Sequence, residues 1–119
     1  MKKRKYNVAV VGVTGAVGQE MLRVLEARCF PVNQLLPLAS ARSAGKRTKF
    51  KGKRLTIQEL TEDSFDGIDI ALFSAGGGTS KQFAPAATTA GAVVIDTSST
   101  FRTEKTVPLV VQLQKRWNQ

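Results

Sequence analysis

The chain has 119 residues, enough for about one domain, and its 42% hydrophobic and 23% charged residues are typical of a folded globular protein. No apolar run approaches the roughly 20 residues that a membrane span needs, and no secretory cleavage site follows the basic residues 2–5. With one cysteine and no histidine, the composition excludes an internal disulfide and a cysteine-based metal cluster, and it predicts a cytoplasmic location.

The first half of the chain predicts two strands, a helix and a hairpin. Residues 7–13 form an unalternating, β-branched run that is typical of a strand buried on both faces of a parallel sheet. Apolar residues then recur at helical spacing over 17–28 until Pro31 stops the pattern. Residues 35–40 predict a second strand, which Pro37 marks as irregular or near a sheet edge. The rest of this half predicts a hairpin over 50–57 that turns at Gly52, and a short helical turn over 61–65.

The second half repeats the alternation of strand and helix. Residues 68–74 and 92–96 predict buried strands, and 79–90 predict a helix between them. Thr79 or Ser80 can cap that helix, and Pro85 favours a kink or a late start. Strands alternating with helices in this order indicate βαβ units joined by right-handed crossovers. The predicted fold class is therefore α/β, a Rossmann-like, doubly wound and mostly parallel sheet.

A turn with spaced glycines joins the first strand to the first helix. Gly12, Gly15 and Gly18 stand where a dinucleotide-binding fold needs a tight turn, a close approach of backbone to pyrophosphate, and close packing of helix on strand. The free N–H groups and the positive end of the helix dipole would then face the phosphates. The alternative is a glycine turn with a purely structural role.

The charge at the end of the second strand indicates which dinucleotide is bound. NAD sites usually place an acidic residue there to hold the ribose 2′-hydroxyl, but the chain has none between Glu26 and Glu59. Ser40, Arg42 and Ser43 offer a guanidinium and two hydroxyls, which suit the 2′-phosphate of NADP. We therefore expect NADP, the alternative being that Arg42 is an ordinary surface residue.

A third loop, Ser74-Ala75-Gly76, follows another buried strand. Ligands of open α/β sheets bind at the carboxyl ends of the strands, near the reversal in strand order, so this loop is interpreted as a second wall of the cofactor cleft. A plain turn after a strand is the alternative. The candidate cofactor-binding residues are Gly12, Thr14, Gly15, Ala16, Val17, Gly18, Ser40, Arg42, Ser43, Ser74, Ala75 and Gly76.

Basic residues are concentrated in one segment. The net charge is +9, and residues 42–54 hold seven lysines and arginines without a carboxylate. The favoured interpretation is an exposed hairpin whose lysines discourage edge-to-edge pairing. The second interpretation is that these residues, mainly Arg42, bind a phosphate of the nucleotide. The least favoured interpretation is that they contact the phosphates of a nucleic acid.

Several segments together resemble the aspartate-semialdehyde dehydrogenase family. The resemblance covers residues 8–111 and rests on Gly12-Val13-Thr14-Gly15-Ala16-Val17-Gly18-Gln19-Glu20, Leu38-Ala39-Ser40-Ala41-Arg42-Ser43-Ala44-Gly45-Lys46, Asp69-Ile70-Ala71-Leu72-Phe73-Ser74-Ala75-Gly76-Gly77 and Val94-Ile95-Asp96-Thr97-Ser98-Ser99-Thr100-Phe101-Arg102. A fifth segment, Val107-Pro108-Leu109-Val110-Val111, completes the set. Thr97 stands where the family commonly has asparagine.

The resemblance implies an enzyme that interconverts aspartyl phosphate and aspartate semialdehyde with NADPH, in the biosynthesis of lysine, threonine and methionine. It places Thr14 to Val17 on the cofactor phosphates, Arg42 and Ser43 on the 2′-phosphate, and the Ser74 loop near the nicotinamide ribose. Arg102 matches a family arginine that holds the substrate phosphate, a role that suits its fork of N–H donors. The full-length family forms homodimers.

The resemblance also implies that the family's catalytic residues are absent from this chain. The family uses a cysteine thiolate as nucleophile and a histidine as acid and base, whereas this chain has no histidine. Cys29 does not match the nucleophile, and we expect it to be a buried or half-buried core residue. We expect an NADP-binding domain over residues 1–111, a divergent tail over 112–119 and no catalytic or dimerisation domain, so that the chain is a single incomplete domain without turnover.

Two other reductase families and one class of non-catalytic protein are the alternatives to this interpretation. Acetylglutamyl-phosphate reductases share the chemistry, but Ala16 and residues 39–46 favour the aspartate enzyme. A short-chain reductase needs a Tyr-x-x-x-Lys pair, and the one tyrosine, Tyr6, precedes the first strand. A non-catalytic nucleotide-binding module stays open as the alternative of a different class.

Overall fold

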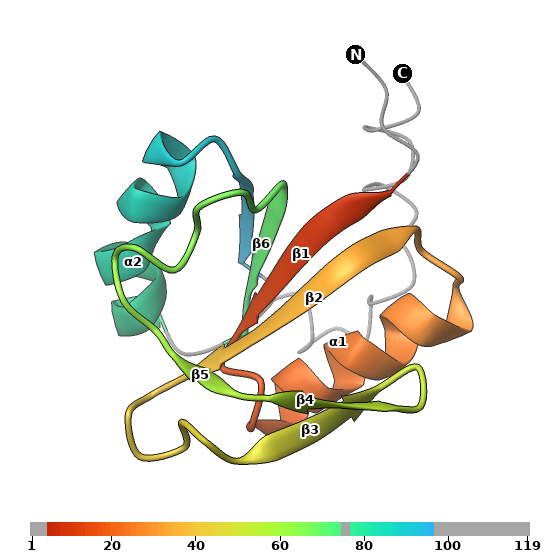
Figure 1. Ribbon diagram of the computed structural model, residues 1–119. Coiled ribbons are helices and arrows are strands. Elements are labelled where there is room, and N and C mark those ends of the chain that lie inside the picture. The colour runs from red at the N-terminus through yellow and green to blue at the C-terminus, as the bar shows by residue number, and fades with distance from the viewer. Residues whose placement is uncertain (1–4, 75–76, 97–119) are drawn as a thin grey trace.

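The computed structural model describes residues 5–74 and 77–96, and they form a parallel sheet with one helix on each face (Figure 1). The five-stranded sheet has the order β5-β2-β1-β6-β7, and every neighbouring pair in it is parallel. The elements are β1 (Tyr6–Val11), α1 (Ala16–Ala27), β2 (Val32–Ala39), β3 (Arg47–Phe50), β4 (Lys53–Thr56), β5 (Gln58–Glu59), β6 (Ile70–Phe73), α2 (Gly77–Thr89) and β7 (Val93–Asp96). The predicted fold class is confirmed.

The strand order reverses at β1, as a doubly wound fold requires. The chain passes from β1 through α1 to β2 on one side, and β6, α2 and β7 follow on the other. The carboxyl ends of β1 and β6 therefore stand side by side where the two halves meet, which is where such sheets bind ligands.

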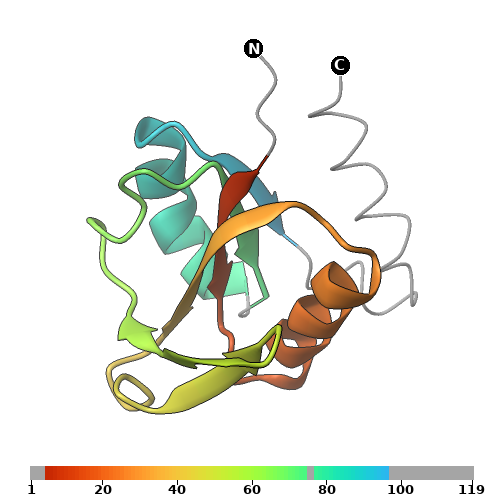
Figure 2. The same ribbon diagram turned by 45° about the vertical axis from the view of Figure 1, so that its right-hand side comes forward.

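Alternate residues of β1 supply two separate cores. Val8 and Val10 pack with α1 and the hairpin on one face, while Ala9 and Val11 pack with Phe65, Phe73 and α2 on the other. Figure 2 shows the two helices on opposite sides of the sheet. A strand buried on both faces has no polar positions to alternate, which explains the continuous apolar run that predicted it.

The β3–β4 hairpin forms a two-stranded antiparallel sheet of its own beside α1. Lys51 and Gly52 form its turn with φ values of +52° and +78°, the two positive angles of a tight hairpin turn. Thr48 and Phe50 face inward and are buried. The hairpin thus begins three residues earlier than the sequence pattern predicted, although the predicted turn at Gly52 is confirmed.

Pro37 lies where the outer edge of β2 is open. β5 pairs with β2 only at Leu38 and Ala39, so the N–H that Pro37 lacks is not needed by a neighbour on that side. The predicted position near an edge is therefore confirmed, and β2 begins at Val32, ahead of the predicted strand.

Three local predictions are wrong. Residues 61–65 form hydrogen-bonded turns instead of helix, with Phe65 stacked on Phe73 at 5.9 Å between ring centroids. α2 begins at Gly77, so Thr79 lies inside the helix instead of capping it, and of the two alternatives at Pro85 the late start is wrong. The kink stays a prediction.

Cys29 is exposed, which corrects the expectation of a core position. It follows the C-cap Arg28 with φ +53°, donates its N–H to Glu26 O at 3.1 Å, and is followed by Phe30 N–H to Leu25 O at 3.1 Å. This pair of bonds is the Schellman motif, which points the side chain at the left-handed position outward and brings the next residue, Phe30, into the core.

Candidate dinucleotide-binding site

The glycine turn is held tightly against both neighbouring strands. Gly12 N–H and Val13 N–H both donate to Leu38 O of β2, at 2.9 and 3.2 Å. Gly12 has φ +82°, a left-handed backbone that favours glycine. These bonds hold the turn at the carboxyl edge of the sheet, so that α1 begins at that edge.

Gly18 allows α1 to lie directly on the turn. A Cβ at Gly18 would stand 2.4 Å from Gly12 O and 2.7 Å from Val13 Cα, both rigid backbone atoms. Gly15 differs, since a Cβ there would meet Gly12 O at an ordinary 3.6 Å. The role of close helix packing therefore falls to Gly18, and Gly15, which is exposed, leaves open space in front of the helix.

Several backbone donors in the first turn of α1 have no acceptor within the part of the chain that the structure describes. Gly15 is the N-cap, no side chain caps the helix, and no acidic residue lies in its first turn. The first turn of any helix has N–H groups without an internal partner. Among the described residues, none accepts a hydrogen bond from the N–H of Thr14, Ala16, Val17 or Gly18. An uncapped and exposed helix start is a site for an anion.

Ser74 connects the two strands that meet at the reversal of strand order. Its N–H donates to Val11 O at 2.9 Å, and its hydroxyl lies 2.6 Å from Val11 O and 3.2 Å from Gly12 O. The end of β6 is thereby attached to the glycine turn, as the sequence predicted for the second wall. Ala75 and Gly76 of that loop, and Arg102, lie outside the described residues.

The loop that carries Arg42 follows β2, on the opposite side of β1 from Ser74. Residues 41–45 form turns after β2, with Ser43 N–H and Ala44 N–H donating to Ser40 O at 2.9 and 3.1 Å. Arg42 and Ser40 are exposed, and Ser43 is half-buried. Arg42 has no hydrogen-bond or ion-pair partner among the described residues, so its guanidinium is available to a ligand.

Gln19 is a residue of the site to which the sequence reasoning assigned no role. Its side-chain amide donates to Val13 O at 2.7 Å and reaches Thr48 Oγ1 at 3.1 Å. Thr48 is only 8% exposed and is the one buried polar residue among those described. The signal in the sequence was a threonine, Thr48, between basic residues of the hairpin. That Gln19 is its partner became clear only from the position of β3 against α1.

A hollow in the surface lies away from the predicted site residues. It has a volume of about 830 Å³ and runs along the open edge of β2, with Leu35, Leu36, Leu55 and Lys53 among its lining residues. None of the predicted site residues lines it. We place the candidate site at the start of α1, where backbone N–H groups have no acceptor among the described residues, because a hollow alone does not indicate a dinucleotide.

Two findings on the described residues limit other chemistry. No group of three or more histidine, cysteine, aspartate or glutamate side chains within residues 5–74 and 77–96 is arranged to hold a metal ion. Neither helix in those ranges is long and apolar enough to cross a lipid bilayer.

A parallel, doubly wound sheet with a glycine turn at its reversal point defines a dinucleotide-binding domain. Residues 7–116 match the family described as "Semialdehyde dehydrogenase, NAD binding domain". The chain belongs to this family, and the matched region corresponds to the part that binds the nicotinamide cofactor.

Relatives within the family agree with the resemblance drawn from the sequence. The chain is 55% identical over 108 residues to an aspartate-semialdehyde dehydrogenase of Bacillus subtilis, and 58% identical over 107 residues to one of Aquifex aeolicus. These alignments cover 91% and 89% of this chain but 31% and 32% of the relatives. A crystal structure of aspartate semialdehyde dehydrogenase II from Vibrio cholerae, complexed with ASA, has a TM-score of 0.76 and 51% identity over 84% of this chain and 33% of that one. The chain therefore spans about a third of the length of the curated relatives it matches.

Proposed function

We propose that the chain is the NADP(H)-binding part of an aspartate-semialdehyde dehydrogenase. In this proposal the complete enzyme acts in the cytoplasm as a homodimer. It reduces L-aspartyl-4-phosphate to L-aspartate-4-semialdehyde and phosphate, in the biosynthesis of lysine, threonine and methionine. The observation that carries the proposal is the set of free N–H donors at the start of α1, flanked by the Ser74 and Arg42 loops.

In this proposal the backbone of the glycine turn holds the pyrophosphate. The N–H groups of Thr14, Ala16 and Val17 donate to its oxygens, and the helix dipole adds a favourable positive potential. Gly15 keeps the approach open, since it carries no side chain in front of the helix. Ser74 keeps the turn against β6, which positions the nicotinamide half of the cofactor at the reversal point.

NADP is favoured over NAD by the charges after β2. Residues 40–46 contain no carboxylate to hold a ribose hydroxyl, and a carboxylate would repel a phosphate. Arg42 has no other described partner and can form a forked, charge-assisted pair with the 2′-phosphate, supported by Ser40 and Ser43.

The nicotinamide supplies hydride transfer when it is bound, whereas the nucleophile and the proton donor are not among the residues of this site. The chain has no histidine. Cys29 follows the C-terminal end of α1, and the 12 residues of that helix place it about 18 Å from the glycine turn. We therefore expect the 119-residue chain to bind the cofactor without turning over aspartate semialdehyde, as a phosphate-dependent NADP reduction assay would show. Measurable turnover would contradict this.

The test of the proposal is a pair of equilibrium titrations with NADPH and NADH. We expect NADPH to bind at least tenfold more tightly, because a hydrogen bond to a charged group contributes about 1.5–3 kcal/mol. Arg42→Ala should remove most of that preference by weakening NADPH while leaving NADH unchanged. Arg28→Ala is the matched control, since Arg28 is exposed at the opposite end of α1.

Equal affinities for the two cofactors, or tighter binding of NADH, would contradict the assignment of NADP. Binding of neither would contradict the proposed function itself.

A further inference from the structure

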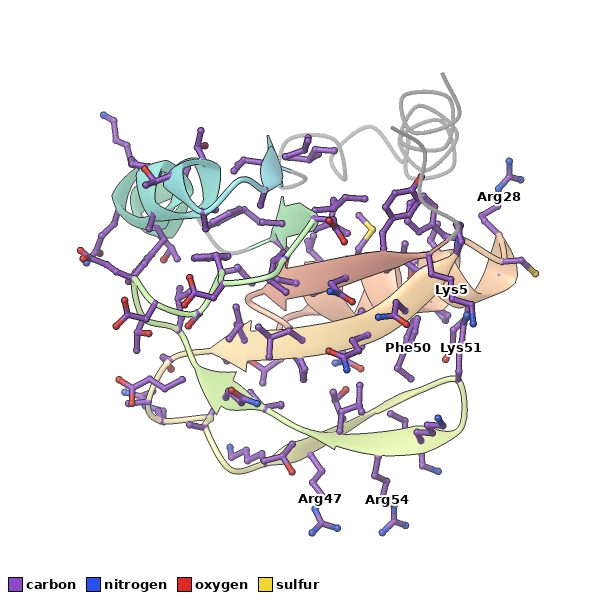
Figure 3. All side chains as sticks on the ribbon, turned by 45° about the horizontal axis from the view of Figure 1, so that its top comes forward. Lys5, Arg28, Arg47, Phe50, Lys51 and Arg54 are labelled. Atoms are coloured by element: carbon purple, nitrogen blue, oxygen red, sulfur yellow. The ribbon has the colours of Figure 1, made fainter. Side chains whose placement is uncertain are left out.

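The outward face of the β3–β4 hairpin carries a row of cations. Lys49 lies directly opposite Arg54 in the antiparallel register, and Arg47 lies two residues before Lys49 on the same strand face. All three are exposed. Figure 3 shows the side chains of Arg47 and Arg54 projecting in the same direction, away from the five-stranded sheet. We call these three residues the basic face.

This arrangement has an electrostatic cost, and no ion pair of the described residues offsets it. Like charges directly opposite each other on two strands are destabilising. No residue of the basic face forms an ion pair within the described parts of the chain. Glu26 of α1 lies beside the tip of the hairpin. It accepts a hydrogen bond from the backbone N–H of Lys51 and not from a side chain of the basic face. Lysines on an edge strand also discourage pairing with another chain, and that role does not exclude a second one for the same cations.

The basic face begins beside the proposed phosphate site. The base of the hairpin is attached to the turn that carries Arg42, through Gly45 N–H to Ile57 O at 2.8 Å and Ile57 N–H to Lys46 O at 2.7 Å. The bond from Gln19 to Thr48 attaches β3 to the first turns of α1. A groove of about 330 Å³ between α1 and β3 is lined by Ala16, Gln19 and Lys49, and also by Glu20 and Glu26. Lys49 therefore brings the basic face to the first turn of α1.

We propose that the basic face guides the phosphorylated cofactor toward the glycine turn and speeds its association without contacting it in the bound state. This rests on the proposed function and deepens it, since it identifies what selects NADPH during the encounter. A patch of one sign of charge raises the association rate of an oppositely charged ligand by about 10-fold to 1,000-fold. The 2′-phosphate adds about two negative charges, so the acceleration should be larger for NADPH than for NADH.

The proposal is tested by stopped-flow binding of NADPH and NADH to the full chain. The Lys49→Gln/Arg54→Gln variant removes two charges from the basic face. Arg28→Gln/Lys81→Gln is the control with the same net charge, because it removes exposed cations from the C-terminal end of α1 and from α2. Near 0.01 M salt, where screening acts over about 30 Å, we expect the hairpin variant to bind NADPH about tenfold more slowly.

Three further readouts make the result specific. The dissociation rate of NADPH should stay within about twofold of wild type, the loss for NADH should be smaller, and both losses should vanish near 1 M salt, where screening acts over about 3 Å. The thermal midpoint of the hairpin variant should not fall, because the substitutions relieve repulsion.

Several results would overturn the inference. These are an unchanged association rate, an equal loss in the charge-matched control, or a faster dissociation that indicates direct contact. A wild-type chain that binds duplex DNA more tightly than NADPH, with that binding lost in the hairpin variant, would assign the basic face to nucleic acid instead. Each of these leaves NADPH binding itself intact, whereas a wild-type chain that does not bind NADPH would contradict the proposed function.

Discussion

The two ends of α1 treat their backbone polar groups in opposite ways. At the C-terminal end, Cys29 and Phe30 close the last turn with two hydrogen bonds, and Phe30 is buried beneath them. At the N-terminal end, no side chain caps the helix, and the N–H groups of Ala16, Val17 and Gly18 have no acceptor among the described residues.

This difference separates structure from function along one helix. A closed end accepts a strained residue, as the left-handed Cys29 shows, because its role is only to end the helix. An open end with exposed donors costs stability in an isolated domain and is useful only when something else supplies the acceptors. The open end also lies at the edge of the sheet where β2 and β6, which precede the Arg42 and Ser74 loops, end on either side of β1.

The largest effect on the difference between the two ends of α1 is expected from adding a side chain at Gly18. Gly18→Ala places a methyl group within van der Waals overlap of two backbone atoms of the turn, so α1 must move off the strand. We expect a loss of about 3 kcal/mol in the free energy of unfolding, measured by urea denaturation. Gly15→Ala is the matched control, since its methyl has ordinary room.

The Gly15→Ala control also isolates the binding role of the open end. It should unfold within about 1 kcal/mol of wild type yet bind NADPH at least tenfold more weakly, because the new methyl group lies where the backbone must approach the phosphates. If both alanine variants unfolded alike, the assignment of close packing to Gly18 would be wrong.

The side-chain hydrogen bonds of Gln19, which attach the open N-terminal end of α1 to the glycine turn and to β3, can be removed by a substitution of similar size. Gln19→Leu removes the amide that connects Val13 O to Thr48, and we expect it to cost about 1–2 kcal/mol by thermal denaturation. Thr48→Val removes only the second of these bonds and should cost less. A Thr48→Val loss equal to that of Gln19→Leu would show that the bond to Val13 contributes nothing.

The closed end should respond in the opposite direction. Cys29→Gly relieves a positive φ angle that costs a non-glycine residue about 1–2 kcal/mol, so we expect stability to rise by roughly 0.5–1 kcal/mol. Arg28→Gly is the control, because Arg28 has an ordinary φ of −91° and should lose stability instead. A destabilised Cys29→Gly would show that the thiol makes contacts that outweigh the strain.

The sequence predicted best those parts of the fold that depend on residues close together in the chain. Buried parallel strands such as β1 have continuous apolar runs, and the glycine turn between a strand and a helix has one common structural context. The position of Ser74 beside that turn could be predicted as well, because the carboxyl ends of parallel strands share an edge. The role of Arg42 stays a prediction.

What sequence did not predict depends on contacts between distant segments. β5 has two residues and exists only because Leu38 and Ala39 accept it as a neighbour. Thr79 resembles a cap, but the helix extends two residues before it. Cys29 has the apolar character of a core residue, and the handedness of the helix end turns it outward. Gln19 needed the hairpin in place before its partner Thr48 could be known.

The account depends on whether the free N–H groups at the start of α1 receive the cofactor. Backbone amide chemical shifts of the full chain, followed by NMR during titration with NADPH, test this directly. We predict that the largest shifts fall on Thr14 to Gly18 and on Ser40 to Ser43, and that Cys29 and Phe30 do not move. Saturable binding of NADPH with those amides unchanged would contradict the account.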